Sequence, residues 1–241
     1  MLRVALVGYG KMGRQVEQKI RETPGIELVG IVDPKAPEQA NTLNELEGSF
    51  DVIIDFSHPD NLDMIGHYAE DHPAALVVAT TGYSESQIDF IKRLAGKVPI
   101  VFTANFSLGI TVMARVLEQM GSALSDSFDI ELIEKHHNQK LDSPSGTAKM
   151  LVNAVDPGKT FFRTFGREGN GKRQKEIGIH AIRGGNIVGE HTVLFAGEDE
   201  ILEITHKATS KQVFANGAVR AAQFVAGQTP GLYDMNDVLF G

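Results

Sequence analysis

The chain has 241 residues, a net charge of −8 and no cysteine. This length suits one large domain or two modest ones, and 42% hydrophobic residues are typical of soluble globular proteins. The lack of cysteine excludes disulfides and cysteine-based metal sites and is consistent with a cytoplasmic protein. The acidic balance argues against nucleic-acid binding, which depends on Lys and Arg. No segment approaches the roughly 20 apolar residues of a membrane span, so we expect no membrane partner.

Short apolar runs alternate with helical patterns over the first hundred residues. The runs are rich in Val and Ile, as in parallel strands that are buried on both faces. Leu2–Val7 is followed by a glycine-rich turn and not by the small-residue cleavage site of a signal peptide, so we interpret it as a strand. The alternation predicts a doubly wound α/β parallel sheet. The predicted strands are Leu2–Val7, Ile26–Val32, Val52–Phe56, Ala75–Ala79 and Val98–Phe102, and the predicted helices are Met12–Glu22, Pro59–Asp71 and Ser84–Leu94.

The pattern changes after Phe106. Apolar spacing predicts helices over Leu108–Leu124 and Pro144–Val155, with a strand over Phe128–Glu134 between them. The basic, polar stretch Asp156–Lys175 fits either a mobile loop over a site or a solvated linker.

Three more strands are predicted in the second half, separated by turns at Gly184–Asn186 and Gly197–Asp199, both of hairpin type. They indicate a second, α+β domain on a mixed or antiparallel sheet. A helix and a short irregular tail, Gly231–Gly241, follow. The predicted strands are Glu176–Arg183, Ile187–Phe195 and Glu200–His206, and the predicted helix is Val213–Ala226.

The first turn carries a dinucleotide-binding pattern, Gly8-Tyr9-Gly10-Lys11-Met12-Gly13. It follows a strand and opens a helix, where free N–H groups and the helix dipole favour phosphate. Asp33 ends the second strand and would take the ribose hydroxyls, which favours NADH, whereas Lys35 could attract the extra phosphate of NADPH. Alternatively, the glycines only form a tight turn and Lys35 is solvated.

Hydroxyl groups, an amide and exposed backbone stand at the ends of the fourth and fifth strands, and open α/β sheets bind ligands at such ends. They could hold the nicotinamide ribose and carboxamide, or could simply form turns. These residues are Ala79, Thr80, Thr81 and Gly82, and Thr103, Ala104, Asn105 and Phe106.

A histidine–lysine segment follows the strand that precedes Pro144. His136 can pass a proton in either direction near neutral pH, and Lys140 can donate a proton or pair with a carboxylate. Ser143 suits the N-cap of the next helix and Pro144 its first position. The N–H groups of Ser145, Gly146 and Thr147 would then be free to bind a carboxylate or phosphate.

Two less specific interpretations of this segment remain. Adjacent histidines are often surface residues, and the Ser-Pro-Ser-Gly-Thr turn could be only a helix cap. A metal could also be held with His180, His191 or His206, but no HExxH-like spacing is present. We therefore expect no metal site.

Glu134–Ala148 resembles the signature of the bacterial 4-hydroxy-tetrahydrodipicolinate reductases (dihydrodipicolinate reductases), Glu-x-His-His-x-x-Lys-x-Asp-x-Pro-Ser-Gly-Thr-Ala. The likeness extends along the chain, through Asp55–Ser57, Gly189–Thr192 and Phe214–Ala218. It implies NADH- or NADPH-dependent reduction of a small dicarboxylate in lysine and diaminopimelate biosynthesis. It also implies a Rossmann domain, residues 1–106 with 213–241, and a mixed-sheet domain, residues 107–212, that assembles a homotetramer.

The resemblance also implies a role for each matching residue. His136 and Lys140 match the proton-transfer residues, and His137, Gly146 and Thr147 match residues that hold the substrate. Gly8–Gly13, Asp33, Thr80, Thr81 and Ala104–Phe106 match the nucleotide contacts. Two departures are a glycine loop one residue shorter than in some members, and Pro34 where some carry an arginine that favours NADPH, a role that Lys35 could take. Rival hypotheses are a polyol dehydrogenase of similar architecture and an NAD-sensing protein without catalysis.

Overall fold

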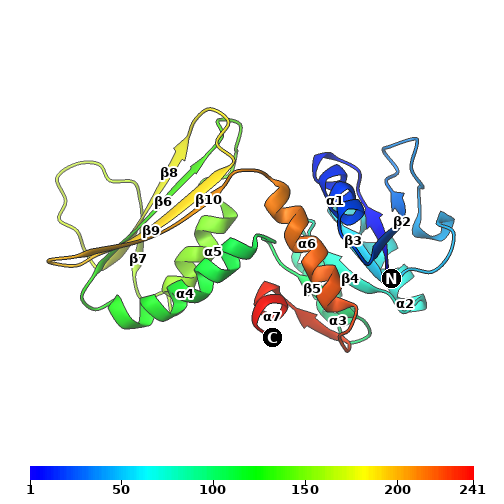
Figure 1. The fold of residues 1–241 in the computed structure, drawn as a ribbon. Helices are drawn as coiled ribbons and strands as arrows, with labels where there is room; N and C mark the ends of the chain where they lie inside the picture. The colour runs from blue at the N-terminus through cyan, green and yellow to red at the C-terminus, as the bar shows by residue number, and fades with distance from the viewer. The chain divides into compact units, whose positions relative to one another are not determined.

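The computed structural model describes all residues from Met1 to Gly241, and they divide into two compact units. Unit 1 comprises Met1–Leu108 and Gln212–Gly241, and unit 2 comprises Gly109–Lys211. The chain thus leaves unit 1 once and returns to it (Figure 1). No helix combines the length and the apolar character that crossing a membrane requires.

Unit 1 is built on a six-stranded parallel sheet with the strand order β11-β5-β4-β3-β1-β2. Because both faces are covered by helices, its strands are almost continuously apolar. Residues of α1, α6 and α7 pack on one face, and residues of α2 and α3 pack on the other. The strands are β1 (Leu2–Val7), β2 (Ile26–Val32), β3 (Val52–Asp55), β4 (Ala75–Val78), β5 (Pro99–Phe102) and β11 (Gly231–Tyr233); the helices are α1 (Lys11–Glu22), α2 (Leu62–Asp71), α3 (Glu85–Leu94), α6 (Gln212–Val225) and α7 (Met235–Phe240).

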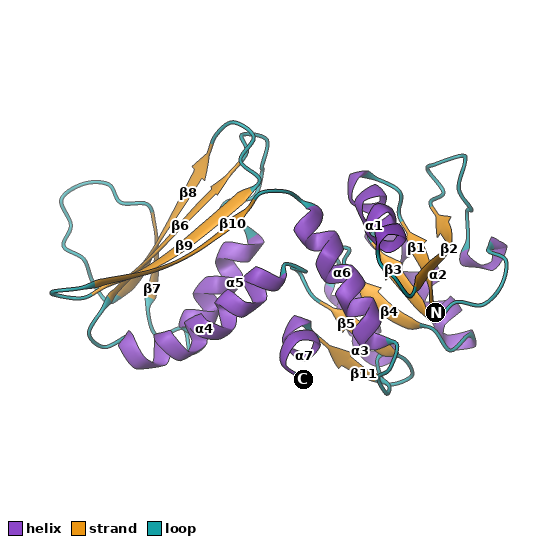
Figure 2. Cartoon of the chain, viewed as in Figure 1, coloured by secondary structure: helices purple, strands orange, loops and turns teal.

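Unit 2 is built on a five-stranded mixed sheet with the order β10-β9-β6-β8-β7. The central strand β6 pairs parallel with β8 and antiparallel with β9. Helices α4 and α5 both pack on one face of this sheet, here called the helix-covered face (Figure 2). The other face is here called the open face. The strands are β6 (Asp129–His136), β7 (Phe162–Phe165), β8 (Glu176–Arg183), β9 (Gly189–Ala196) and β10 (Ile201–Ala208); the helices are α4 (Leu108–Leu124) and α5 (Gly146–Val155).

The fold class predicted from sequence is confirmed, a doubly wound parallel sheet with a second mixed sheet. The prediction of a hairpin turn at Gly184–Asn186 is wrong. This segment joins β8 to β9, but β6 lies between those two strands in the sheet. Gly184 instead donates a backbone hydrogen bond to His136 O, at the end of β6. The Gly197–Asp199 turn does join neighbouring antiparallel strands, β9 and β10.

Two segments that we expected to lack regular structure contain strands. The tail forms β11, which extends the parallel sheet beside β5, and α7, which is capped by Asp234. The basic stretch contains β7, which pairs parallel with β8 along the edge of the second sheet. Both strands are short and gain their order from pairing with distant segments, so local composition does not reveal them.

Candidate active site

The glycine loop of unit 1 adopts a conformation that only small residues allow. Gly8 has a φ of 95°, and a Cβ on it would lie 2.3 Å from Phe56 O. A Cβ on Gly13 would lie 2.0 Å from Gly8 O, so the start of α1 packs directly on the turn. A Cβ on Gly10 would meet nothing within 4 Å. The loop therefore leaves open space beside Gly10, at the helix N-terminus where phosphate is favoured.

A cavity of about 290 Å³ extends from this loop along the end of β2. Asp33 and Lys35 both line it, as do Gly8 and Gly10. The Asp33 carboxylate accepts hydrogen bonds from the backbone N–H groups of Tyr9 (2.7 Å) and Lys35 (2.9 Å). These bonds fix the carboxylate at the cavity wall and leave further lone pairs for a ligand.

A second cavity, of about 420 Å³, lies beyond the ends of β3 and β4. Met12, Ala79, Thr80 and Thr81 line it together with Phe56 and Ser57. Thr103–Phe106 line neither of these two cavities. The ring of Phe106 is buried 6.1 Å from the ring of Phe56.

The buried carboxylate of Asp55 forms hydrogen bonds with residues of two loops near these cavities. Asp55, at the end of β3, accepts hydrogen bonds from the Ser57 N–H (3.0 Å) and from the Tyr83 hydroxyl (2.9 Å). Burial raises the pKa of Asp55 above its usual value. Hydrogen bonds from Ser57, Thr80 and Tyr83 act in the opposite direction but do not outweigh burial. Tyr83 carries no local signal of this role in the sequence, because its contact with Asp55 spans 28 residues.

In unit 2, His136 ends β6 on the helix-covered face and is buried. Its Nδ1 forms a hydrogen bond with Glu134 Oε2. Its Nε2 lies beside Gly189 of β9, where a Cβ would be only 3.1 Å away. Burial lowers the pKa of His136, and the nearby cations Lys140 and Arg183 act in the same direction, whereas Glu134 opposes them. The neutral ring is therefore favoured at neutral pH.

Glu134 is completely buried and has three kinds of partner. Arg183 NH1 and NH2 donate to its two oxygens, at 2.9 and 2.8 Å, and Ser145 N donates to Oε1 at 3.0 Å. Burial raises the pKa of Glu134, but the hydrogen bonds from Arg183, Ser145 and His136 outweigh it, and the pKa is lowered. The carboxylate is thus ionised, although no solvent reaches it.

Lys140 and His137 lie in the loop after β6, and both are partly buried. The Lys140 ammonium forms a 2.7 Å ion pair with Asp142 Oδ1. Burial raises the pKa of Asp142, whereas hydrogen bonds from Lys140 and from the Gly146 backbone lower it, and the net direction is down. A carboxylate of the chain itself therefore contacts both Lys140 and the N-terminus of α5.

The start of α5 differs from the prediction. Its N-cap is Ser145, whose hydroxyl accepts from Ala148 N at 3.1 Å, and Ser143-Pro144 is a cis peptide outside the helix. The prediction of a free N–H at Ser145 is also wrong, because that group donates to Glu134. Around Gly146 there is open space, since a Cβ on it would meet nothing within 4 Å. The substrate-binding roles of His137, Ser145, Gly146 and Thr147 stay predictions.

His191 on β9 completes the cluster. Its Nε2 lies 3.1 Å from Ser145 Oγ, and its ring packs edge-on against His136 at 5.1 Å. Burial is the largest of the effects that lower the pKa of His191 to about 4. Ligand atoms of Glu134, His136 and His191 lie within 4.8 Å of one another, close enough to hold a metal ion. Arg183 already occupies both Glu134 oxygens, and the expectation of no metal stays a prediction.

Sequence reasoning missed Arg183 and gave Glu134 no role of its own. Arg183 is 49 residues from Glu134, and the two meet because β8 pairs with β6 in parallel register, His136 opposite Arg183. The only local signal is that Arg183 ends a predicted strand, and the sequence does not show that this strand lies beside β6.

The parallel sheet and glycine loop of unit 1 define a class of protein, the two-unit α/β proteins with a Rossmann-type nucleotide-binding unit. Residues 2–106 match the family model described as dihydrodipicolinate reductase, N-terminus, and residues 109–239 match dihydrodipicolinate reductase, C-terminus. The chain belongs to the dihydrodipicolinate reductase family.

Individual relatives agree with this assignment. A 4-hydroxy-tetrahydrodipicolinate reductase of Clostridium novyi is 44% identical to this chain over an alignment of 249 residues. The alignment includes 99% of this chain and 98% of the relative. One of Clostridium tetani is 42% identical over 249 residues, with 99% and 97% covered. The solved structure of a dipicolinate-bound dihydrodipicolinate reductase from Paenisporosarcina sp. TG-14 has the same fold, with a TM-score of 0.82, 23% identity and complete coverage of both chains.

Proposed function

We propose that the chain reduces 4-hydroxy-tetrahydrodipicolinate to tetrahydrodipicolinate, with NADH or NADPH, in lysine and diaminopimelate biosynthesis. The observation that carries the proposal is the match of both halves of the chain to one reductase family, over residues 2–106 and 109–239. The relatives of that name are 40–44% identical over nearly the whole chain.

Unit 1 fits a dinucleotide. The open space at Gly10 would admit a pyrophosphate, Asp33 or Lys35 would meet the adenosine ribose, and Ala79–Thr81 would line the nicotinamide end. Thr103–Phe106 stay candidates for contacts to the nicotinamide, although they line neither cavity. NADH or NADPH supplies a hydride when bound. Asp33 favours NADH and Lys35 favours NADPH, so both cofactors are expected to serve.

Unit 2 fits a small dicarboxylate. Gly146 and Thr147 begin α5, where backbone N–H groups and the helix dipole favour an anion. His137 and Lys140 add polar and cationic groups from the loop after β6. A substrate carboxylate would compete with Asp142, which now accepts hydrogen bonds from Lys140 and Gly146.

Lys140 and His136 are the proposed proton-transfer residues. The reduction adds a hydride to the ring carbon that carries the hydroxyl group, and the hydroxyl leaves as water with one proton. Lys140 can donate that proton from its ammonium. The neutral His136 ring presents Nε2 beside Gly189, where it can accept or return a proton.

The assignment of units and assembly belongs to the same proposal. Residues 1–106 with 213–241 would bind the nucleotide. Residues 107–212 would bind the substrate and assemble a cytoplasmic homotetramer. Sedimentation velocity of the purified chain tests the assembly.

A polyol dehydrogenase is the main rival. A myo-inositol dehydrogenase from Corynebacterium glutamicum shares the fold, with a TM-score of 0.59 and 16% identity over 96% of this chain and 90% of that one. A neutral polyol, however, makes no use of an anion site at α5.

The test is the loss of NADH or NADPH absorbance on freshly prepared 4-hydroxy-tetrahydrodipicolinate, beside NAD(P)+ reduction on myo-inositol. We expect turnover with the dicarboxylate alone. Turnover with the polyol alone would favour the rival. Binding of NADH without turnover on either substrate would indicate a sensor.

A further inference from the structure

We infer that Glu134 and Arg183 form a positioning pair that fixes the ring of His136 in one tautomer and anchors it to the start of α5. The inference rests on the proposed function for the proton-transfer role of His136. Neither Glu134 nor Arg183 is proposed to touch the substrate.

The first step concerns the ring of His136. An ionised carboxylate accepts hydrogen bonds and cannot donate one, so the bond between His136 Nδ1 and Glu134 Oε2 requires a proton on Nδ1 of the neutral ring. Nε2 then carries the lone pair and makes no hydrogen bond within the chain. The ring can then accept a proton only at Nε2, which lies beside Gly189, a residue without a side chain.

The second step concerns the ionisation of Glu134. A fully buried carboxylate would ordinarily be neutral, because burial disfavours its charge. Arg183 neutralises that charge with two parallel hydrogen bonds, the strongest geometry for this pair of groups. A protonated Glu134 could donate to the ring and would permit the other tautomer, so Arg183 controls the tautomer through Glu134.

The third step concerns position. Glu134 Oε1 also accepts from Ser145 N, at the N-cap of α5. Arg183 NH2 donates to Asp142 O at 2.7 Å, in the loop that carries Lys140. One buried ion pair therefore connects the proposed proton acceptor, the proposed proton donor and the proposed carboxylate site. An error of about 1 Å in such an arrangement can lower turnover roughly a hundredfold.

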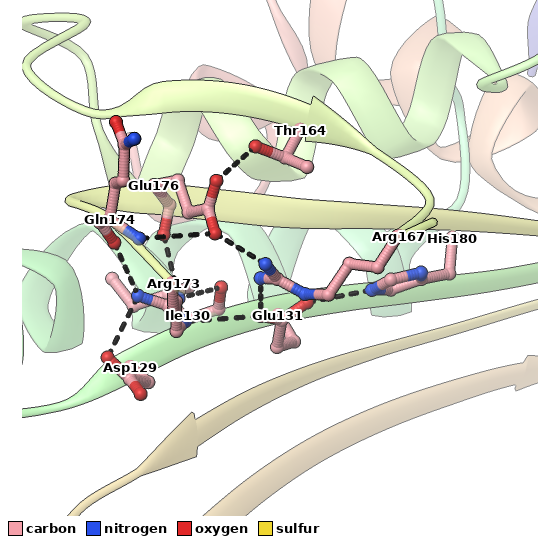
Figure 3. A network of polar contacts seen from close by, with 9 residues as sticks. All are labelled: Asp129, Ile130, Glu131, Thr164, Arg167, Arg173, Gln174, Glu176 and His180. Atoms are coloured by element: carbon pink, nitrogen blue, oxygen red, sulfur yellow. Dashed lines mark hydrogen bonds and ion pairs between the residues drawn. The ribbon is translucent and has the colours of Figure 1, made fainter. Parts of the chain in front are cut away.

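Glu131 provides a matched control on the same strand. It lies three residues before Glu134, so its side chain is on the open face. It also pairs with arginines and a histidine, at 2.6 Å from Arg167 NH2 and 2.7 Å from His180 Nε2 (Figure 3). Loss of this carboxylate changes the charge of β6 without changing the surroundings of His136.

The test compares Glu134→Gln with Glu131→Gln in steady-state kinetics across pH. The side-chain amide introduced by Glu134→Gln can donate to Nδ1 of His136, so it favours the opposite tautomer. We expect kcat to fall roughly a hundredfold with little change in substrate KM. We also expect the limb of the kcat–pH profile that reports His136 to move to lower pH, because the carboxylate that raises the pKa of His136 is gone. Glu131→Gln should keep the wild-type kcat and pH profile. Arg183→Lys retains the charge without the paired hydrogen bonds and should lose less than Glu134→Gln.

Ring ¹⁵N NMR of His136, assigned by its loss in His136→Gln, separates this inference from the proposed function. We expect Nδ1–H in the wild type and Nε2–H in Glu134→Gln. Nε2–H in the wild type, or equal losses of kcat in Glu131→Gln and Glu134→Gln, would overturn the inference. A wild type with Nδ1–H and no turnover would refute the proposed function and leave the positioning intact. If Glu134→Gln fails to fold, the wild-type tautomer and Arg183→Lys still decide.

Discussion

Two carboxylates on β6 show how one strand can support two different polar networks. Glu131 on the open face and Glu134 on the helix-covered face each pair with arginine and histidine. Glu131 is partly exposed, and its network continues outward through Arg173 to Asp129, whose side chain is 60% exposed (Figure 3). Glu134 is completely buried, and its partners continue to Ser145 and to the loop of Lys140.

The difference teaches that the partners alone do not make a functional network. Exposed ion pairs contribute little to stability, because solvent competes for both charges. Removing one member of a buried pair costs several kcal/mol, because the other charge stays uncompensated. We therefore expect changes near Glu134 to alter catalysis or pH dependence strongly, and changes in the open-face network to alter neither.

The largest effect is expected at Lys140. Lys140→Ala removes a proposed general acid and should lower kcat by roughly 10²–10⁴ while NADH affinity is unchanged. Lys135→Ala is the control, because Lys135 pairs with Glu190 at 3.2 Å and its side chain lies on the face opposite to His136. Stopped-flow turnover and NADH titration measure the two quantities. A loss of the same size in both variants would contradict the account.

His191 should produce an intermediate effect, on stability. Its pKa is lowered from 6.5 to about 4 in the fold, so the folded state disfavours its protonation. The stability it contributes is complete above pH 6.5 and is lost as pH falls towards 4, about 3 kcal/mol in all. His191→Gln should remove this component of the pH dependence. Urea unfolding of both proteins at several pH values measures it, and parallel curves would be the contrary result.

The smallest effect is expected at the solvent end of the open-face network. Asp129→Asn breaks an ion pair of 2.8 Å with Arg173, and should change the free energy of unfolding by less than about 1 kcal/mol. Turnover should be unchanged. Thermal unfolding at low and high salt, with a parallel activity assay, checks both. A clear loss of turnover would place the open face in the reaction and end the contrast between the faces.

Much of the fold could be predicted because local patterns determine it. Leu2–Val7 and Leu108–Leu124 carry their own periodicity, and both have the predicted bounds. The order of strands in the second sheet could not be predicted. Gly184–Asn186 has the composition of a hairpin turn, but β6 lies between β8 and β9, the two strands that this segment joins. That insertion depends on pairing between distant segments.

The candidate site divides in the same way. His136 and Lys140 stand in one segment with recognisable chemistry, so residue types alone pointed to them. The environment of His136 depends on Arg183 and His191, which arrive from β8 and β9. The sequence favours Ser143 as the N-cap of α5, whereas in the structure the N-cap is Ser145, whose hydroxyl oxygen accepts a hydrogen bond from Ala148 N.

The most direct measurement of the central claim uses NADH that carries deuterium at the transferable position. The product formed from 4-hydroxy-tetrahydrodipicolinate would be analysed by mass spectrometry and NMR. We predict one deuterium in tetrahydrodipicolinate, at the carbon that lost the hydroxyl group, for each NADH consumed. Tetrahydrodipicolinate without deuterium, or NADH oxidation without this product, would contradict the account.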